Sequence, residues 1–243
     1  MIEKSLKENL IKEYPYKTEM HAHSFPASGC SEVSPEQLVK IYAGLGYNSL
    51  VLTNHFIHKN CLLAQYEKSG IELWYDEYKK AKAYGQECGL NVILGAEIRF
   101  TENENDYLIY GLNKEMLKEI YEYLPFGIEN FRKSYKMPDS VFMQAHPFRD
   151  NCKPIRPELL DGIETLNMHQ GHNSRIAIAT EYASATDLKI VSAGTDFHHL
   201  GRKHEGAAAL RSKEEVTDSF QLAKILKKGD YLLEIGGSAI VLP

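Results

Sequence analysis

The sequence has few cysteines, and their arrangement is not typical of a disulfide framework or of a thiolate cage for structural zinc. Neither a CxxC pair nor a dense spacing occurs among the four, which are Cys30, Cys61, Cys88 and Cys152. Reduced thiols of this kind favour a cytoplasmic protein. The chain also lacks the uninterrupted apolar run of about 18 residues that a membrane span needs. Residues 1–17 lack the apolar core of a secretory signal.

A basic excess is absent as well. The 28 Lys and Arg residues are outnumbered by 33 Asp and Glu residues, which gives a net charge of −5. Proteins that bind nucleic acid broadly usually carry a positive excess, so nucleic acid is not an expected partner. Hydrophobic and charged fractions of 43% and 25% are ordinary for a globular protein. A length of 243 residues predicts one compact domain over residues 1–243.

Short β-like runs alternate with longer helix-like stretches, which is typical of an α/β domain. The predicted strands are residues 18–21, 49–53, 92–97, 107–110, 141–145, 162–166, 190–193 and 231–234. The predicted helices are a stretch from the N-cap Ser34 to Gly44 or Gly46, and residues 71–88, 114–123, 173–184 and 212–228. This number of β/α units in one domain predicts a closed or nearly closed barrel. An open doubly wound sheet is the alternative.

Histidines and carboxylates stand at the ends of several predicted strands. They are His21, His23, His55, Glu97, His146, Asp196 and His198. In a β/α barrel the carboxyl ends of the strands open onto one face, so these side chains are expected to converge there. His21 and His23 are two residues apart and would point to the same side of a strand. Imidazole and carboxylate ligands together suit Zn, Mn or Fe, and a bridging carboxylate can hold two such ions.

Five segments resemble the polymerase-and-histidinol-phosphatase (PHP) domain superfamily in order and spacing. They are EMHAHS, SPEQLVKIYAGLGYNSLVLTNHF, GAEIRF, QAHPFR and AGTDFHH, and they span roughly residues 18–200. The resemblance implies a distorted (β/α)7 TIM-like barrel, two or three divalent ions, and an active site at the carboxyl ends of the strands. It implies one ion near His21, His23, Glu97 and Asp196, a second near Glu97 and His146, and a third near His55 and His198.

Some positions depart from the family pattern. Ser28 and Gly29 stand where members often carry an acidic residue, which predicts a missing ligand of the third ion unless Glu32 replaces it. Asp106 stands where many members have a histidine, and a carboxylate can replace an imidazole at a divalent ion. An ordinary aspartate at a strand start is the alternative. Asn54 replaces the aspartate of the commoner TDH triplet and keeps a hydrogen bond but not the charge.

The activity that the resemblance implies is hydrolysis of a small phosphomonoester by water activated on the metals. Arg149 is the first candidate for binding the phosphate during catalysis and Arg175 the second, because a guanidinium matches phosphate oxygens. Either arginine could instead form a surface ion pair. A general acid is not singled out among His169, His172, His199 and His204. Two alternatives remain open, namely a metal-dependent amide or imine hydrolase and a degenerate metal-binding module without turnover.

Overall fold

The computed structural model describes residues 2–59, 70–201, 205–236 and 239–241, so the predictions made for Cys61 and His204 lie outside the described residues. The strands are β1 (Tyr16–Ala22), β2 (Ser49–Leu52), β3 (His55–Ile57), β4 (Asn91–Leu94), β5 (Ala96–Arg99), β6 (Asp106–Tyr110), β7 (Val141–Gln144), β8 (Gly162–Asn167), β9 (Ile190–Gly194), β10 (Ala208–Ser212), β11 (Tyr231–Ile235) and β12 (Ala239–Val241). Within these ranges no helix is long and apolar enough to cross a membrane.

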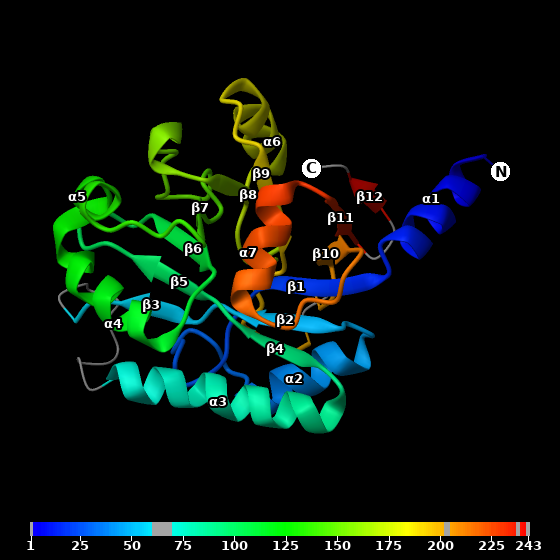
Figure 1. The fold of residues 1–243 in the computed structure, drawn as a ribbon, viewed down its shortest axis with the longest axis horizontal. Coiled ribbons are helices and arrows are strands. Elements are labelled where there is room, and N and C mark those ends of the chain that lie inside the picture. The colour runs from blue at the N-terminus through cyan, green and yellow to red at the C-terminus, as the bar shows by residue number, and fades with distance from the viewer. Residues whose placement is uncertain (1, 60–69, 202–204, 237–238, 242–243) are drawn as a thin grey trace.

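Helices cover the strands from several sides (Figure 1). They are α1 (Ile2–Glu13), α2 (Pro35–Gly44), α3 (Gly70–Cys88), α4 (Lys114–Tyr123), α5 (Gly127–Ser134), α6 (Ile176–Ala185) and α7 (Ser219–Lys228), with short 3-10 turns at Leu124–Phe126 and Pro157–Leu159. Helices α2 and α3 pack against each other, α6 packs on β8, and α7 packs on β6 and β7. Helix α1 extends away from the rest of the molecule (Figure 1).

The strands form two six-stranded sheets rather than the closed barrel or the single open sheet considered from the sequence. The first has the order β12-β11-β10-β1-β2-β4 and the second the order β3-β5-β6-β7-β8-β9. The pairs that involve β6, β10, β11 and β12 are antiparallel, so the chain is a mixed α/β fold and not a regular β/α repeat. Among the described residues, a single isolated bridge between Ala22 and Phe197 joins the end of β1 to the segment after β9.

Breaks in two strand-like segments explain why the strands do not close into one barrel. The predicted strand 92–97 is interrupted at Gly95, with β4 pairing in the first sheet and β5 in the second. A Cβ at Gly95 would lie 2.7 Å from Val51 Cγ1 and 3.0 Å from Thr53 Cγ2, so the side chains of the neighbouring segment leave no room for one here. The segment after β2 breaks in the same way before β3. At each break the chain passes from the first sheet to the second.

Local signals predicted the helices better than the connections between strands. Ser34 forms the predicted N-cap of α2 in a capping box with Gln37, which confirms that start. The predicted helix 212–228 is wrong at its beginning, because Asp218 caps α7 and Ser212 belongs to β10. The predicted helix 173–184 begins only at Ile176. Elements α1, α5, β3, β10 and β12 were not predicted.

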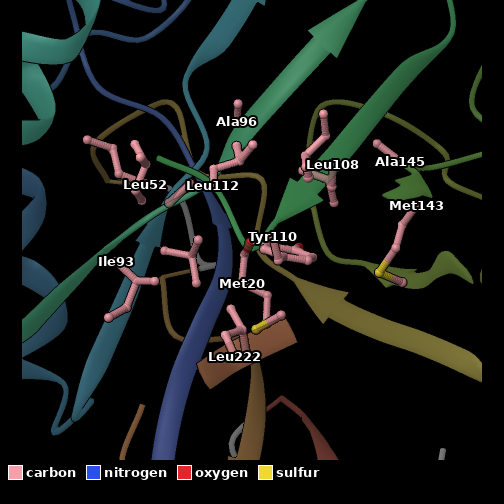
Figure 2. Close-up of a cluster of buried hydrophobic side chains, with 14 of the residues drawn as sticks. Met20, Leu52, Ile93, Ala96, Leu108, Tyr110, Leu112, Met143, Ala145 and Leu222 are labelled. Atoms are coloured by element: carbon pink, nitrogen blue, oxygen red, sulfur yellow. Dashed lines mark hydrogen bonds between the residues drawn. The ribbon is translucent and has the colours of Figure 1, made fainter. Parts of the chain in front are cut away.

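The core lies between the two sheets and α7. Figure 2 shows Leu52 and Ile93 from the first sheet meeting Leu108 and Tyr110 from the second, with Leu222 of α7 in the same cluster. All five side chains are buried. The Ser219 hydroxyl at the start of α7 donates to the Leu94 carbonyl and accepts from the amides of Gly111 and Leu112. These bonds attach α7 to a strand of the first sheet and to the segment that follows β6 of the second sheet.

Candidate metal centre

The end of β1 places two imidazoles side by side. His21 and His23 alternate with Met20 and Ala22, so both rings point to the same side of the strand. Both histidines are fully buried, and their Nε2 atoms lie 3.1 Å apart. This spacing suits two ligands of one ion, whose bonds to nitrogen are about 2.0–2.1 Å long.

The Glu97 carboxylate lies at the centre of the cluster. Its Oε1 is 3.0 Å from His146 Nε2 and 3.4 Å from His21 Nε2. Its Oε2 is 2.9 Å from His55 Nδ1 and 3.3 Å from His23 Nε2. Each oxygen therefore faces two imidazoles, which is the arrangement expected of a carboxylate that bridges two ions.

Asp196 presents one oxygen to the histidines and the other to supporting residues. Its Oδ1 is 3.3 Å from His23 Nε2 and 3.5 Å from His21 Nε2. Its Oδ2 accepts hydrogen bonds from Arg149 Nη2 and from Asn167 Nδ2. The carboxylate is thereby oriented, with Oδ1 left for the cluster.

Backbone strain occurs at two of the predicted ligands. His146 has φ +28° and Asp196 has φ +50°, in the region that residues other than glycine rarely adopt. Such conformations persist only where the surroundings hold them, and they gather at functional sites. Here they turn each side chain inward from the end of its strand.

Three overlapping groups of side chains each bring their ligand atoms within 4.8 Å of one another. They are His23 with His55 and His198, His21 with His23 and Glu97, and His55 with Glu97 and Asp106. The imidazoles of His23 and His198 are stacked, with ring centroids 4.2 Å apart. The structure thus gathers the side chains predicted from the sequence at one place.

Asp106 reaches this place because β6 is antiparallel to β5 and β7, which brings its amino end to their carboxyl ends. Its carboxylate is held by Arg99, with Nε 2.6 Å from Oδ1 and Nη2 2.5 Å from Oδ2. Asp106 Oδ2 lies 4.0 Å from His146 Nε2. Like Asp196, which pairs with Arg149, Asp106 is therefore a predicted ligand whose charge a cation of the protein already neutralises.

The donor set fits divalent ions. Within the described part of the chain, His55 Nδ1 and Glu97 Oε2 are buried 2.9 Å apart without hydrogen-bond geometry between them, and neither has another hydrogen-bond partner. Buried polar atoms are seldom left unpaired, and a metal ion would satisfy both. Imidazole nitrogens and carboxylate oxygens are the ligands that zinc, manganese and iron share.

Burial and charge oppose each other within the cluster. Burial raises the pKa of the Glu97 carboxyl, but His55 and His21 outweigh it and hold that pKa well below its usual range. Burial lowers the pKa of His21, yet Glu164, Asp196 and Glu97 raise it well above its ordinary value. Perturbation of this kind at neighbouring groups is typical of functional sites.

Glu164 is a functional residue that the sequence interpretation missed. Its Oε1 is 2.9 Å from His21 Nδ1, while Oε2 accepts from the amide of His146 and from Asn167 Nδ2. A carboxylate behind a metal-binding imidazole fixes its tautomer and its direction, so Glu164 leaves His21 Nε2 for the cluster. The available signal was an acidic residue in the middle of the predicted strand that became β8.

Gly194, the last residue of β9, leaves room for His21. A Cβ at Gly194 would lie 2.4 Å from His21 Cβ and 2.8 Å from Glu164 Oε1. We therefore expect Gly194→Ala to cost about 1–3 kcal/mol of stability, as overpacking usually does. Because His21 must move, we also expect a loss of metal affinity of about 10–100-fold. Urea unfolding and metal titration measure the two effects.

Gly44→Ala is the matched control, since nothing lies within 4 Å of a Cβ at that position near the end of α2. It should leave both quantities unchanged. Full metal affinity in Gly194→Ala would show that His21 does not depend on this close contact.

Ser28, one of the two residues in place of the usual acidic ligand, supports the histidines. Ser28 Oγ lies 3.0 Å from His23 Nδ1 and accepts from the amide of His55 at 2.8 Å. Glu32, the predicted replacement, points elsewhere: it accepts from the amide of Leu200, and its Oε2 is 3.5 Å from His199 Nδ1.

A cavity of about 850 Å³ opens over the cluster. Its lining includes the predicted ligands His55, Asp106, His146, Asp196 and His198, and also Cys30, Arg149, Cys152, His169, His172 and His199. Burial raises the pKa of the Cys30 thiol, but interactions with His198 and His55 outweigh burial, so the pKa is lowered to about 6. Arg175 lines a second, smaller hollow. Its guanidinium bonds to the Phe148 carbonyl and to Asp150, so it contacts protein groups rather than the cluster.

No family model matches the chain, and no curated protein matches it either. Solved structures do. One is a two-domain protein from Bacteroides vulgatus that contains a predicted PHP-like metal-dependent phosphoesterase, at 15% identity and a TM-score of 0.60 over 91% of this chain. The chain spans 65% of that protein's length.

A second structure, from Bifidobacterium adolescentis, carries a provisional assignment as a metal-dependent phosphoesterase. It is 16% identical with a TM-score of 0.51, over 87% of this chain and 96% of that one. An amidohydrolase from Chromobacterium violaceum has 14% identity over 76% of this chain and 88% of its own, with a TM-score of only 0.43. The chain therefore has the fold of PHP-like structures.

Proposed function

We propose that this chain, with its PHP-like fold, is a single divalent-metal-dependent hydrolase domain that cleaves a small phosphomonoester. The position of Glu97 carries the proposal. Its buried carboxylate lies between four imidazoles, and Oε2 has no hydrogen-bond partner in the described structure. The two phosphoesterase-like structures support the class of reaction but not a particular substrate.

The ions would be held as the family resemblance implies. His21, His23, Glu97 and Asp196 would hold one ion, Glu97 and His146 a second, and His55 and His198 a third. Asp106 is a further candidate ligand of the second ion. Divalent ions at such a cluster lower the pKa of water to near neutrality and polarise phosphoryl oxygens. Zinc, manganese and iron all suit these ligands.

Arg149 has two roles in this proposal. It donates to Asp196 Oδ2 and to Asn167 Oδ1, so it orients a predicted metal ligand. It also lines the cavity, and its Nε is buried without a hydrogen-bond partner within the described residues. A guanidinium in this place can donate to phosphate oxygens and stabilise the charge that develops on them.

Replacing Arg149 with alanine is expected to lower kcat/KM for a phosphomonoester about 10–100-fold, because a hydrogen bond to a charged group contributes about 1.5–3 kcal/mol. Arg149→Lys should recover part of this loss, since a lysine keeps the charge without the planar fork. Arg175→Ala is the control, because that guanidinium is engaged with Phe148 and Asp150. Equal rates in Arg149→Ala and the unmodified protein would remove Arg149 from the mechanism.

Metal content and activity test the function together. We expect two or more Zn, Mn or Fe equivalents per chain purified without chelator, and hydrolysis of a generic phosphomonoester. His21→Ala and Asp196→Ala should lose both. Little metal after reconstitution would favour the degenerate binding module, whereas full metal with turnover of amides but not of phosphoesters would favour the amide hydrolase.

A further inference from the structure

The cavity over the predicted metal ligands has an apolar side. Its lining there includes Phe56, Ile57, Ile71, Trp74 and Tyr121. Ile57 is half-buried, and the other four side chains are more than nine-tenths buried. A cavity with aromatic and apolar walls and a few polar groups at one end is typical of a site for a small organic ligand.

The rings on the apolar side hold one another in place. Phe56 packs edge-on against Trp74 and Tyr121, with ring centroids 5.3 and 5.9 Å apart. Trp74 Nε1 donates a hydrogen bond of 2.9 Å to the carbonyl of His55, a predicted metal ligand. The position of the apolar side is thereby fixed relative to the cluster.

Strand β3 sets the distance between the cluster and the apolar side. His55 and Ile57 are two residues apart in β3, so their side chains lie on the same face, about 6–7 Å apart along the strand. Their partners in β5 are Glu97 and Arg99, and both carboxylate oxygens of Asp106 bind the Arg99 guanidinium. A phosphate ester held at the cluster would therefore place its alcohol part beside Ile57.

Two carboxylates face the same cavity. Glu102 and Glu104 follow β5, line the cavity and are exposed. Negative charge at this position opposes the binding of a ligand that carries a second anionic group besides its phosphate.

Resting on the proposed phosphomonoesterase function, we propose that the apolar side binds the alcohol part of the substrate and that this part is an uncharged aromatic ring. A ring buries apolar area against Ile57 and Ile71 and packs favourably beside other rings. The hydroxyl groups of a sugar phosphate would lose water on this side without finding hydrogen-bond partners. The substrate class is therefore an aryl or arylmethyl phosphomonoester.

Trp74 is the only tryptophan in the sequence, so its fluorescence reports on this side of the cavity. The metal-loaded full chain is titrated with benzylphosphonate, an analogue of benzyl phosphate that is not hydrolysed, with excitation at a wavelength that tyrosine does not absorb. Ethylphosphonate and cyclohexylmethylphosphonate are then titrated as competitors. We expect a saturable change in Trp74 fluorescence and a Kd for benzylphosphonate about 10–100-fold below that of ethylphosphonate, because a phenyl group is buried. The Kd of cyclohexylmethylphosphonate should lie about 2–10-fold above that of benzylphosphonate, because its ring is not aromatic.

Ile57→Thr tests the site with a side chain of similar shape that suits a strand. The preference for benzylphosphonate over ethylphosphonate should fall about tenfold, because a hydroxyl replaces apolar surface beside the ring. Ile178→Thr is the matched control, since Ile178 is an exposed residue of α6 outside the cavity lining, and it should keep the full preference. The unfolding midpoint of each variant shows whether it has folded. In the unmodified protein 4-carboxybenzylphosphonate should bind more weakly than benzylphosphonate, because Glu102 and Glu104 repel its carboxylate.

The outcomes separate this proposal from the proposed function. Equal Kd values for benzylphosphonate and ethylphosphonate, or the same preference in Ile57→Thr as in Ile178→Thr, overturn the role of the apolar side. If benzyl or ethyl phosphate is hydrolysed in that case, the proposed function stands. A cyclohexylmethylphosphonate that binds as tightly as benzylphosphonate overturns the aromatic ring as the preferred group. Selective binding of benzylphosphonate without hydrolysis of either ester overturns the proposed function and leaves the ring-binding site.

Discussion

Replacing Glu97 with glutamine is expected to remove tightly bound metal and to lower phosphomonoester turnover by more than about a hundredfold, beyond the roughly 10–100-fold cost of changing a residue that only supports a ligand. The carboxylate faces His146 through Oε1 at 3.0 Å and His55 through Oε2 at 2.9 Å. Glutamine has the same shape but no charge, and its NH2 group would face ring nitrogens. Elemental analysis after reconstitution and initial rates measure the two losses.

Glu234→Gln is the matched control for this variant. Glu234 is also a buried strand carboxylate, in β11, but its partners are Arg211 and Lys17 rather than the histidines. It should lose some stability and keep its metal content and turnover. If Glu97→Gln retained metal and activity, the carboxylate would not be the bridge on which the proposed function depends.

Metal removal is expected to have the second large effect, and one that grows with pH. Burial and Arg149 lower the pKa of His146, but Cys152 and Glu97 outweigh them, so the pKa is raised to about 9. A raised histidine pKa contributes stability that is fully present below the unfolded value of about 6.5 and is lost as pH rises through the folded value. The pKa values of His21, His55 and His198 are raised in the same direction.

Groups with a lowered pKa oppose this trend between pH 6.5 and 9. The Cys30 thiol, with a pKa lowered to about 6, contributes stability that increases as pH rises toward its unfolded value. Burial also lowers the pKa values of His23, His169 and His172, so these residues oppose the trend only near pH 6.5, where their unfolded forms are still partly protonated. Four raised histidines outweigh these groups, so the metal-free protein should lose stability from pH 6.5 to 9.

The metal-loaded protein should behave in the opposite way, because bound ions require deprotonated imidazoles and bind more tightly as pH rises. At a free metal concentration a thousandfold above Kd, binding stabilises the fold by about 4 kcal/mol. That corresponds to a rise in Tm of roughly 10 °C for a chain of this size. Thermal unfolding is measured at pH 6.5 and 8.5, with and without chelator. The difference in Tm between the metal-loaded and the metal-free protein should be larger at pH 8.5.

Asp196→Asn is the control for this experiment. It removes the charge of a predicted ligand, so metal should have little effect on its Tm at either pH. If metal changed the Tm of the unmodified protein equally at both pH values, the histidines of the cluster would not bind the ions.

The sequence by itself determined the local elements and the composition of the cluster. Helix α2 could be predicted because Ser34 and Gln37 act within one turn, and β1 because its histidines alternate with apolar residues. Strand ends followed by histidine or carboxylate predicted which side chains would meet. These signals are short in range, so no knowledge of strand pairing was needed.

Only the tertiary structure decided how the strands pair and what supports the cluster. The break at Gly95, the antiparallel direction of β6 and the approach of Glu164 to His21 depend on partners far away in the sequence. Strand pairing and burial are set by the packing of the whole chain, and this packing is why the two sheets and the supporting residues could not be predicted from local pattern.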